Sequence, residues 1–330
     1  MNNTATNKGI TVARYTGHGN LYLDAENGNR MVAAPVVSAA LYRRFLAYLD
    51  VAPKSVQTYA MAIKQFFLYL QEKGISSPAR EDIFAFRASL LEAHKPTTVQ
   101  NYIVAVRLFF QWAAQEGFYP NIAEHIKGAK IDKAHKKDYL TAKQIRTILG
   151  AIETDTLQGK RDYAIIALMV TCGLRDIEVY RANIGDLRAY GESTVLFIQG
   201  KGHDEKTDYV KVPQHVEAAI RAYLTERGGA ATPDTPLFTS GSNNSNGNRL
   251  STRTIGGIPK KRFRAVGFDS ERLTAHSLRH TAVTLSLLAG KDITEVQQFA
   301  RHSNIATTQI YNHSLDKEKN SCSAAVSDSI

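Results

Sequence analysis

The stretch that decides the fold of this chain is His276-Ser-Leu-Arg279-His280, which leads into an apolar segment around Leu287. In a helix, a spacing of three places the side chains of His276 and Arg279 on one face. His276 and His280 are spaced like a pair of metal ligands, but the glutamate of the common zinc motif is absent between them. A structural histidine is more frequent than a ligand in such a pair, so the stretch gains meaning only from residues elsewhere in the chain.

A second polar position lies upstream, at Arg175. It directly follows Gly173-Leu174, where the sequence predicts the end of a buried helix over about 160–172. The guanidinium is therefore expected at a reversal of the chain, and Glu178, one helical turn further on, can orient it. The structural alternative is that Arg175 only forms an ion pair with Glu178 or Asp176.

Lys201, His302 and Tyr311 complete the set of polar positions. Lys201 lies between two glycines at the tip of a predicted hairpin, and Lys206 is an alternative lysine in the same turn. Tyr311 follows His302 by nine residues near the C-terminal end. Taken singly, these positions would be explained by a solvated lysine, a structural histidine and a half-buried aromatic residue.

Taken together, the order arginine, lysine, His-x-x-Arg, histidine and tyrosine resembles the active-site order of the tyrosine recombinases, the phage integrase family. Neighbouring letters resemble that family too: Gly-Leu-Arg-x-x-Glu at 173–178, Gly-Lys-Gly at 200–202, His-x-Leu-Arg-His-Thr at 276–281 and Thr-Thr-Gln-Ile-Tyr at 307–311. The resemblance covers about residues 36–313. Arg301 departs from it, because the family commonly has glycine before the second histidine, and a less tight turn is expected there.

The resemblance implies DNA strand transfer without a metal or another cofactor. A tyrosine oxygen attacks the scissile phosphate and forms a 3′-phosphotyrosine, which conserves the bond energy for rejoining. A phenol with a pKa of about 10 needs a base, and the charge on the phosphate oxygens needs cations. By resemblance, Tyr311 is the nucleophile, His276 is the general base and Lys201 is the general acid. Arg175 and Arg279 would hold the phosphate, and His302 would bind a non-bridging oxygen. Glu178 would orient Arg175 or His276, and His280 would support the structure.

We therefore predict a site-specific DNA recombinase, an integrase, that serves the integration or excision of a mobile element. Two alternatives share the chemistry: a type IB-like enzyme that relaxes DNA, and a resolvase of chromosome or plasmid dimers. The non-enzymatic alternative is an architectural DNA-binding protein. A separate helical domain and a short basic linker favour a recombinase over a relaxing enzyme, and the complete set of active-site candidates argues against an architectural role.

The predicted fold is mainly α, with an N-terminal helical core-binding (SAM-like) domain and an α+β tyrosine-recombinase catalytic domain that contains a small β-sheet. Apolar residues at steps of three and four predict helices over 59–70 and 99–113, and strands are expected over 194–199 and 209–212. The predicted division is an N-terminal arm (1–35), a helical domain (36–127), a basic linker (128–138), a catalytic domain (139–313) and a C-terminal tail (314–330).

The charge of the chain indicates a polyanionic partner. Its 41 lysines and arginines exceed its 31 aspartates and glutamates, which gives a net charge of +10. Double-stranded DNA is the partner that fits both this excess and the resemblance. Solvated segments are the structural alternative for each basic run. The predicted DNA-contacting residues are Lys127, Lys130, Lys133, Lys136 and Lys137 around the linker, and Lys260, Lys261, Arg262 and Arg264 in the catalytic domain.

The composition excludes several other classes of protein. Two cysteines, Cys172 and Cys322, cannot build a disulfide framework. No apolar run approaches the roughly 20 residues of a membrane helix, and the first residues do not resemble a secretory signal. We therefore expect a cytoplasmic, nucleoid-associated protein without a membrane partner. A homotetramer in the synaptic complex and accessory DNA-bending or directionality proteins are the further partners that the resemblance implies.

Overall fold

The computed structural model describes residues 39–130, 138–200, 205–229, 232–241, 247–319 and 326–327. The chain divides into two compact units, Met1–Lys133 and Ala134–Ile330. The predicted N-terminal arm and most of the predicted linker and tail lie outside the described residues. None of the described helices is both long and apolar enough to span a membrane.

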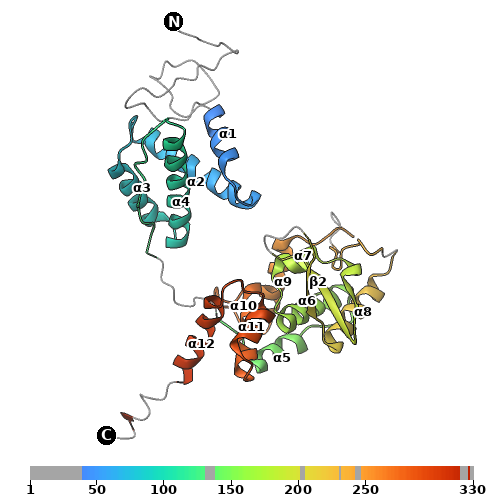
Figure 1. Cartoon of the computed structure of the whole chain (residues 1–330). Coiled ribbons are helices and arrows are strands. Elements are labelled where there is room, and N and C mark those ends of the chain that lie inside the picture. Colours follow the sequence, from blue (N-terminus) through green and yellow to red (C-terminus); the bar gives the residue numbers. More distant parts are fainter. Residues whose placement is uncertain are drawn as a thin grey trace. The chain divides into compact units, whose positions relative to one another are not determined.

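The described part of the first unit contains four helices, and the apolar periodicity of the sequence predicted the second and the fourth (Figure 1). The second and fourth helices each begin with a proline, which is favourable in the first helical turn, where no backbone N–H is needed. Gly74 and Gly117 follow these helices with φ angles of 66° and 72°, as expected for C-terminal stops. The helices are α1 (Ala39–Tyr48), α2 (Pro53–Glu72), α3 (Arg80–Ala93) and α4 (Pro96–Gln115).

An aromatic core holds α2, α3 and α4 together. The Phe66 ring lies 5.1 Å from the Phe86 ring and 5.9 Å from the Phe110 ring, both near edge-to-face. Trp112 is 2% exposed, so the tryptophan is a core residue rather than a base-stacking platform. The first unit therefore has its own hydrophobic core.

The described residues of the second unit form helices and one small sheet, so the predicted α+β class is confirmed. The three strands are antiparallel in the order β1-β2-β3, and Leu196 of the central strand pairs with Leu187 and Val210. The elements are α5 (Ala142–Gly150), α6 (Leu157–Cys172), α7 (Asp176–Arg181), η1 (Ile184–Asp186), β1 (Leu187–Tyr190), β2 (Ser193–Ile198), β3 (Asp208–Lys211), α8 (Gln214–Arg227), α9 (Thr252–Ala265), α10 (Ala275–Leu288), α11 (Ile293–Ala300) and α12 (Ala306–Lys319).

Two features of the second unit differ from the sequence prediction. Strand β1 was not predicted, because most of its residues are exposed and show no alternation of apolar and polar side chains. The predicted boundary at 313 falls inside α12, which continues to Lys319. Helix α5 begins with a capping box: Thr141 N donates to Gln144 Oε1 at 2.8 Å, and Gln144 N donates to Thr141 Oγ1 at 3.2 Å.

Helix α6 is the centre of the second unit. Its residues 164–170 are buried on every side, and it contacts α5, α7, α8, α9 and α10 (Figure 1). Gly173 ends the helix in the left-handed conformation with a φ of 61°, as the sequence predicted. This turn leads the chain directly into Arg175 and α7.

Replacing Phe66 with alanine should lower the free energy of unfolding by about 3–5 kcal/mol, because the ring is fully buried and its loss leaves a cavity. Met61 on the same helix is 69% exposed, and Met61→Ala should change the stability by less than about 0.5 kcal/mol. Thermal and denaturant unfolding of both variants checks this. Equal effects of the two substitutions would contradict the packing described above.

Candidate active site

Glu178 lies at the centre of a cluster of arginines. Its side chain is 0% exposed. Its carboxylate accepts hydrogen bonds from Arg175 N and Arg175 Nη1, each at 2.8 Å, and from Arg301 Nη2 at 3.0 Å. Burial by itself raises the pKa of Glu178, but Arg301, Arg175 and Arg279 together lower it below its usual value. The carboxylate is therefore ionised at neutral pH and fixes two guanidinium groups.

Arg279 comes to this cluster from α10. It is 1% exposed, and its guanidinium donates to the carbonyl of Gly173 at 2.6 Å and to the carbonyl of Ala300. Burial, followed by the charges of Arg175 and Arg301, lowers its pKa to about 9. Arg279 therefore remains charged at neutral pH, and it ties the end of α6 to the end of α11.

Arg301 joins the cluster from the turn after α11. It has a φ of 53°, so this position keeps the left-handed conformation despite the absence of glycine. The less tight turn that the sequence led us to expect is not observed. Besides Glu178, the Arg301 side chain donates to the carbonyls of Phe299 at 2.8 Å and Gly173 at 3.1 Å. The sequence had marked Arg301 only as a departure from the family pattern.

His302 and Tyr311 lie beside each other. Their rings are stacked with centroids 6.3 Å apart, and His302 Nδ1 lies 2.9 Å from Thr308 Oγ1 in a hydrogen bond. Burial, with the charges of Arg279, Arg175, Arg301 and His276, lowers the pKa of His302 to about 4. The imidazole is therefore neutral at pH 7.

Tyr311 is buried in the structure, with 6% of its surface exposed. Burial raises the pKa of Tyr311 to about 12, although Arg279 and Arg175 act in the opposite direction. The hydroxyl shares a short hydrogen bond with His280 Nδ1, and the His280 and His276 rings meet edge-to-face at 4.6 Å. His280 was assigned to structural support from the sequence, whereas here it is a direct partner of the phenol.

Cations and neutral donors also line a cavity of about 380 Å³ at this site. Asp208 also lines this cavity, and it is exposed to solvent. Among the described residues, no group of three or more His, Cys, Asp or Glu side chains is arranged to bind a metal ion. The lining includes Arg175, Glu178, Arg301, His302, Ser303 and Thr307.

The lysine positions divide into three groups. Lys201, Lys133, Lys136 and Lys137 lie outside the described residues, so their predicted roles stay predictions. Lys206, the alternative to Lys201, is ion-paired with Asp186. Lys127 and Lys130 are described and are not buried.

The predicted DNA-contacting run on α9 contains side chains in different environments. Arg262 donates to the buried carboxylate of Asp162 at 2.7 and 3.2 Å, and Arg161 binds the other oxygen of the same carboxylate. Arg264 forms an exposed ion pair with Asp269, and Lys261 is exposed. Arg262 therefore balances a buried carboxylate, whereas the ion pair of Arg264 is exposed.

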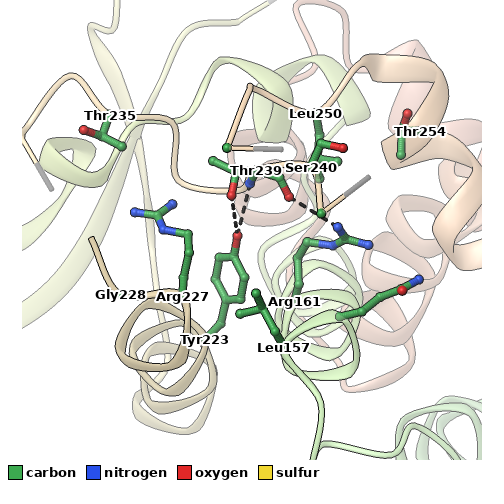
Figure 2. Close-up of a pocket in the computed structure, with 13 residues that line it drawn as sticks. Leu157, Arg161, Tyr223, Arg227, Gly228, Thr235, Thr239, Ser240, Leu250 and Thr254 are labelled. Atoms are coloured by element: carbon green, nitrogen blue, oxygen red, sulfur yellow. Dashed lines mark hydrogen bonds between the residues drawn. The ribbon is translucent and has the colours of Figure 1, made fainter. Parts of the chain in front are cut away.

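A second cavity, of about 700 Å³, lies at the opposite end of α6 (Figure 2). Tyr223 points to Thr239, and their hydroxyls are 3.1 Å apart. Arg161 donates to the Thr239 carbonyl, and Arg227 donates to the carbonyls of Pro236 and Leu237. None of the described residues that the sequence predicted for the active site lines this cavity.

Comparison with known proteins identifies the family of this chain. The model of the phage integrase family matches residues 138–318, more than half of the chain, and the model of the phage integrase N-terminal SAM-like domain matches residues 42–117. The chain belongs to the phage integrase family. Family membership agrees with the resemblance that the order of the polar residues indicated.

Individual relatives in this family are tyrosine recombinases. XerC of Caldanaerobacter subterraneus is 33% identical over 203 residues, and XerA of Pyrococcus furiosus is 30% identical over 267 residues. These matches cover 60% and 81% of this chain. The chain spans 53% of that XerC, 65% of the XerC of Thermodesulfovibrio yellowstonii and 87% of that XerA.

Solved structures share the fold at low sequence identity. XerH recombinase bound to its difH substrate is 20% identical with a TM-score of 0.68, and the match covers 88% of this chain and 84% of that one. The Tn1549 transposon integrase in complex with transposon end DNA is also 20% identical, with a TM-score of 0.64 and coverage of 82% and 93%. At this identity, these similarities establish the fold of the integrase family for this chain.

The lowered pKa of His302 predicts a pH dependence of stability. The ordinary pKa of histidine is 6.5, so His302 in the unfolded chain takes up a proton below this pH, whereas His302 in the folded chain takes it up only near pH 4. Stability is therefore lost as the pH falls through this range. The melting temperature of the wild type should fall more steeply between pH 7 and 4.5 than that of His302→Gln. Parallel curves for the two proteins would show that the imidazole does not titrate as inferred.

Proposed function

We propose that the chain is a site-specific DNA recombinase that cuts and rejoins duplex DNA by transesterification through a 3′-phosphotyrosine. The observation that carries this proposal is the convergence of Tyr311 with Arg175 and Arg279, which both lower the phenol pKa electrostatically. Guanidinium groups can bind the non-bridging oxygens of a phosphate in a two-pronged geometry. Membership of the phage integrase family and relatives named tyrosine recombinases support the proposal.

In the proposed reaction, Tyr311 Oη forms a bond to the scissile phosphorus, and the bond from phosphorus to the 5′ oxygen breaks. Lys201 donates a proton to the leaving oxygen, which becomes a 5′ hydroxyl. Arg175, Arg279 and His302 bind the non-bridging oxygens, where negative charge accumulates in the transition state. The 5′ hydroxyl of a partner strand then attacks the phosphotyrosine, releases Tyr311 and restores a phosphodiester.

The phenol proton leaves through the histidine pair on α10. With a pKa of about 12, Tyr311 is almost wholly protonated at neutral pH, so attack requires a base. His276 is the general base that the family resemblance implies. His280 holds the phenol by a hydrogen bond, and its ring contacts that of His276. The pair thus provides a short route for the proton away from the reacting oxygen.

The biological task proposed is the integration or excision of a mobile element, carried out by a homotetramer on two paired DNA sites. Resolution of chromosome or plasmid dimers would use the same chemistry, and several relatives bear the name XerC. The sequences of captured DNA sites distinguish these tasks. Sites at the ends of a mobile element support the first, and a single site of the chromosome or plasmid supports the second.

The decisive experiment is covalent capture of DNA by the wild type and by Tyr311→Phe. Nicked duplex fragments from the genome that encodes the chain serve as suicide substrates, because loss of a short strand prevents rejoining. Wild type should form a complex that survives SDS, and sequencing of the captured DNA gives the site. Tyr311→Phe should form none, because it lacks the attacking oxygen. Tyr190→Phe, at an exposed tyrosine of β1, is the matched control and should cleave normally.

Covalent capture by both wild type and Tyr311→Phe would show that another residue attacks the phosphate. Absence of capture by the wild type on every fragment would reject the reaction itself. The captured site, made as a synthetic duplex, is the substrate for the measurements below.

The affinity for this duplex should fall steeply with salt, because binding of Lys and Arg to phosphates releases counterions. If Lys260 and Lys261 each contact a phosphate, replacing both with alanine should reduce the slope of log K against log salt by about 2. Fluorescence anisotropy at several salt concentrations measures this slope. Arg221→Ala, on α8, removes an exposed charge elsewhere and should leave the slope unchanged. An unchanged slope in the double lysine variant would remove these residues from the DNA interface.

A further inference from the structure

Arg301 is a cation of the candidate active site that the reaction above does not use. It occupies the residue directly before His302, in a left-handed conformation that glycine adopts more readily. Its side chain contacts Glu178, the carboxylate at the centre of the arginine cluster, and the backbone carbonyls of Gly173 and Phe299.

One nitrogen of Arg301 lacks an acceptor in the described part of the chain. Nη1 donates to the Phe299 carbonyl, and Nη2 donates to the Gly173 carbonyl and to Glu178. The Nε–H is buried and has no hydrogen-bond partner among the described residues. A buried donor without an acceptor is unfavourable, so an unsatisfied guanidinium nitrogen in a native site indicates a missing acceptor.

The charge of the cluster indicates that this acceptor is an anion. Arg175, Arg279 and Arg301 gather around one buried carboxylate, that of Glu178. Asp208, the other carboxylate that lines the cavity among the described residues, is exposed to solvent. Two positive charges of the buried cluster are therefore unbalanced. A phosphodiester carries one negative charge, and its five-coordinate transition state carries two.

The position of the cavity fits the same ligand. Arg301, Arg175 and His302 all line the space of about 380 Å³, together with the hydroxyl-bearing residues Ser303 and Thr307. Arg301 therefore faces the same volume as two of the residues proposed to bind the scissile phosphate. Its side chain is 11% exposed, so a charge contact there is poorly screened by solvent.

Building on the proposed function, we propose that Arg301 is a third guanidinium ligand of the scissile phosphate. It binds the phosphate beside Arg175 and Arg279 and supplies the second unbalanced positive charge to the transition state. Glu178 accepts hydrogen bonds from both Arg175 and Arg301, and so holds the two guanidinium groups on one carboxylate.

The test compares two substrates that differ only in the charge of the scissile phosphate. One is the suicide duplex with its natural phosphodiester, and the other carries a neutral methylphosphonate at the same position. Single-turnover cleavage rates are measured for wild type, Arg301→Gly and Arg301→Lys. Glycine keeps the left-handed turn without a side chain, and lysine keeps the charge without the two-pronged geometry. Arg221→Ala is the control for loss of a charge outside the site.

Arg301→Gly should slow cleavage of the phosphodiester roughly 100-fold, as expected for loss of a donor to the transition state. It should slow cleavage of the methylphosphonate by less than about 3-fold, because the charge that the arginine binds is already absent. Arg301→Lys should slow cleavage of the phosphodiester about 10-fold and should slow cleavage of the methylphosphonate less. Arg221→Ala should match the wild type on both substrates.

If either Arg301 variant loses the same factor in cleavage rate on the two substrates, Arg301 only supports the fold, and the inference is overturned. Cleavage of the phosphodiester by Arg301→Gly at the wild-type rate would also overturn it. Both outcomes leave the proposed function intact, because the wild type still cleaves. If the glycine variant fails to fold, as judged by thermal unfolding, the lysine variant provides the same comparison of substrates. A wild type that forms no covalent complex would instead count against the proposed function.

Discussion

The buried carboxylate of Glu178 is the contact on which the rest of the site depends. It binds the backbone and the side chain of Arg175 at the start of α7, and the side chain of Arg301 at the end of α11. Removal of the carboxylate would leave buried guanidinium groups without a counter-charge, which is strongly unfavourable. A single carboxylate cannot neutralise three arginines, so the same contact that assembles the cluster leaves it positively charged. The cluster is thus held together in the folded protein and still has a net positive charge that can bind an anion.

Burial in the second unit shifts the pKa of three side chains of the candidate site. It raises the pKa of Tyr311, lowers that of His302 and lowers that of Arg279, in each case because a low-polarity environment disfavours the charged form. Of these three side chains, only Arg279 is charged at neutral pH, because its ordinary pKa is far above 7. The protein therefore holds a neutral phenol and a neutral imidazole next to permanent cations. In the proposed reaction, a phosphate that enters this site meets positive charge before Tyr311 loses its proton.

Neighbouring basic residues can have quite different physical roles. Arg262 and Lys261 are adjacent in the chain, but Arg262 balances the buried Asp162 whereas Lys261 faces solvent. The aromatic residues of the first unit show the same principle. Phe66 and Met61 lie on one helix, yet one is at the core and the other is exposed. The environment of each side chain, rather than its type, decides whether a substitution affects stability or binding.

The sequence by itself determined the elements that depend on local chemistry. The capping box at Thr141, the glycine stop at Gly173 and the periodicity of α2 and α4 are set by residues within one or two helical turns. The spacing of His276, Arg279, His302 and Tyr311 also lies within short stretches, and it was enough to indicate the family. Strand β1 was missed because an exposed edge strand has no such pattern.

Only the tertiary structure decided which distant residues meet. Arg301 and Glu178 are 123 positions apart, Arg279 and Gly173 are 106 apart, and Tyr311 and His280 are 31 apart. These contacts arise because α10 packs against α6, α11 and α12, and this packing buries the ends of the helices together. The contact of His280 with the phenol and the place of Arg301 in the cluster have no counterpart in any local spacing. They follow from how whole helices bury their apolar faces, which no short stretch of sequence encodes.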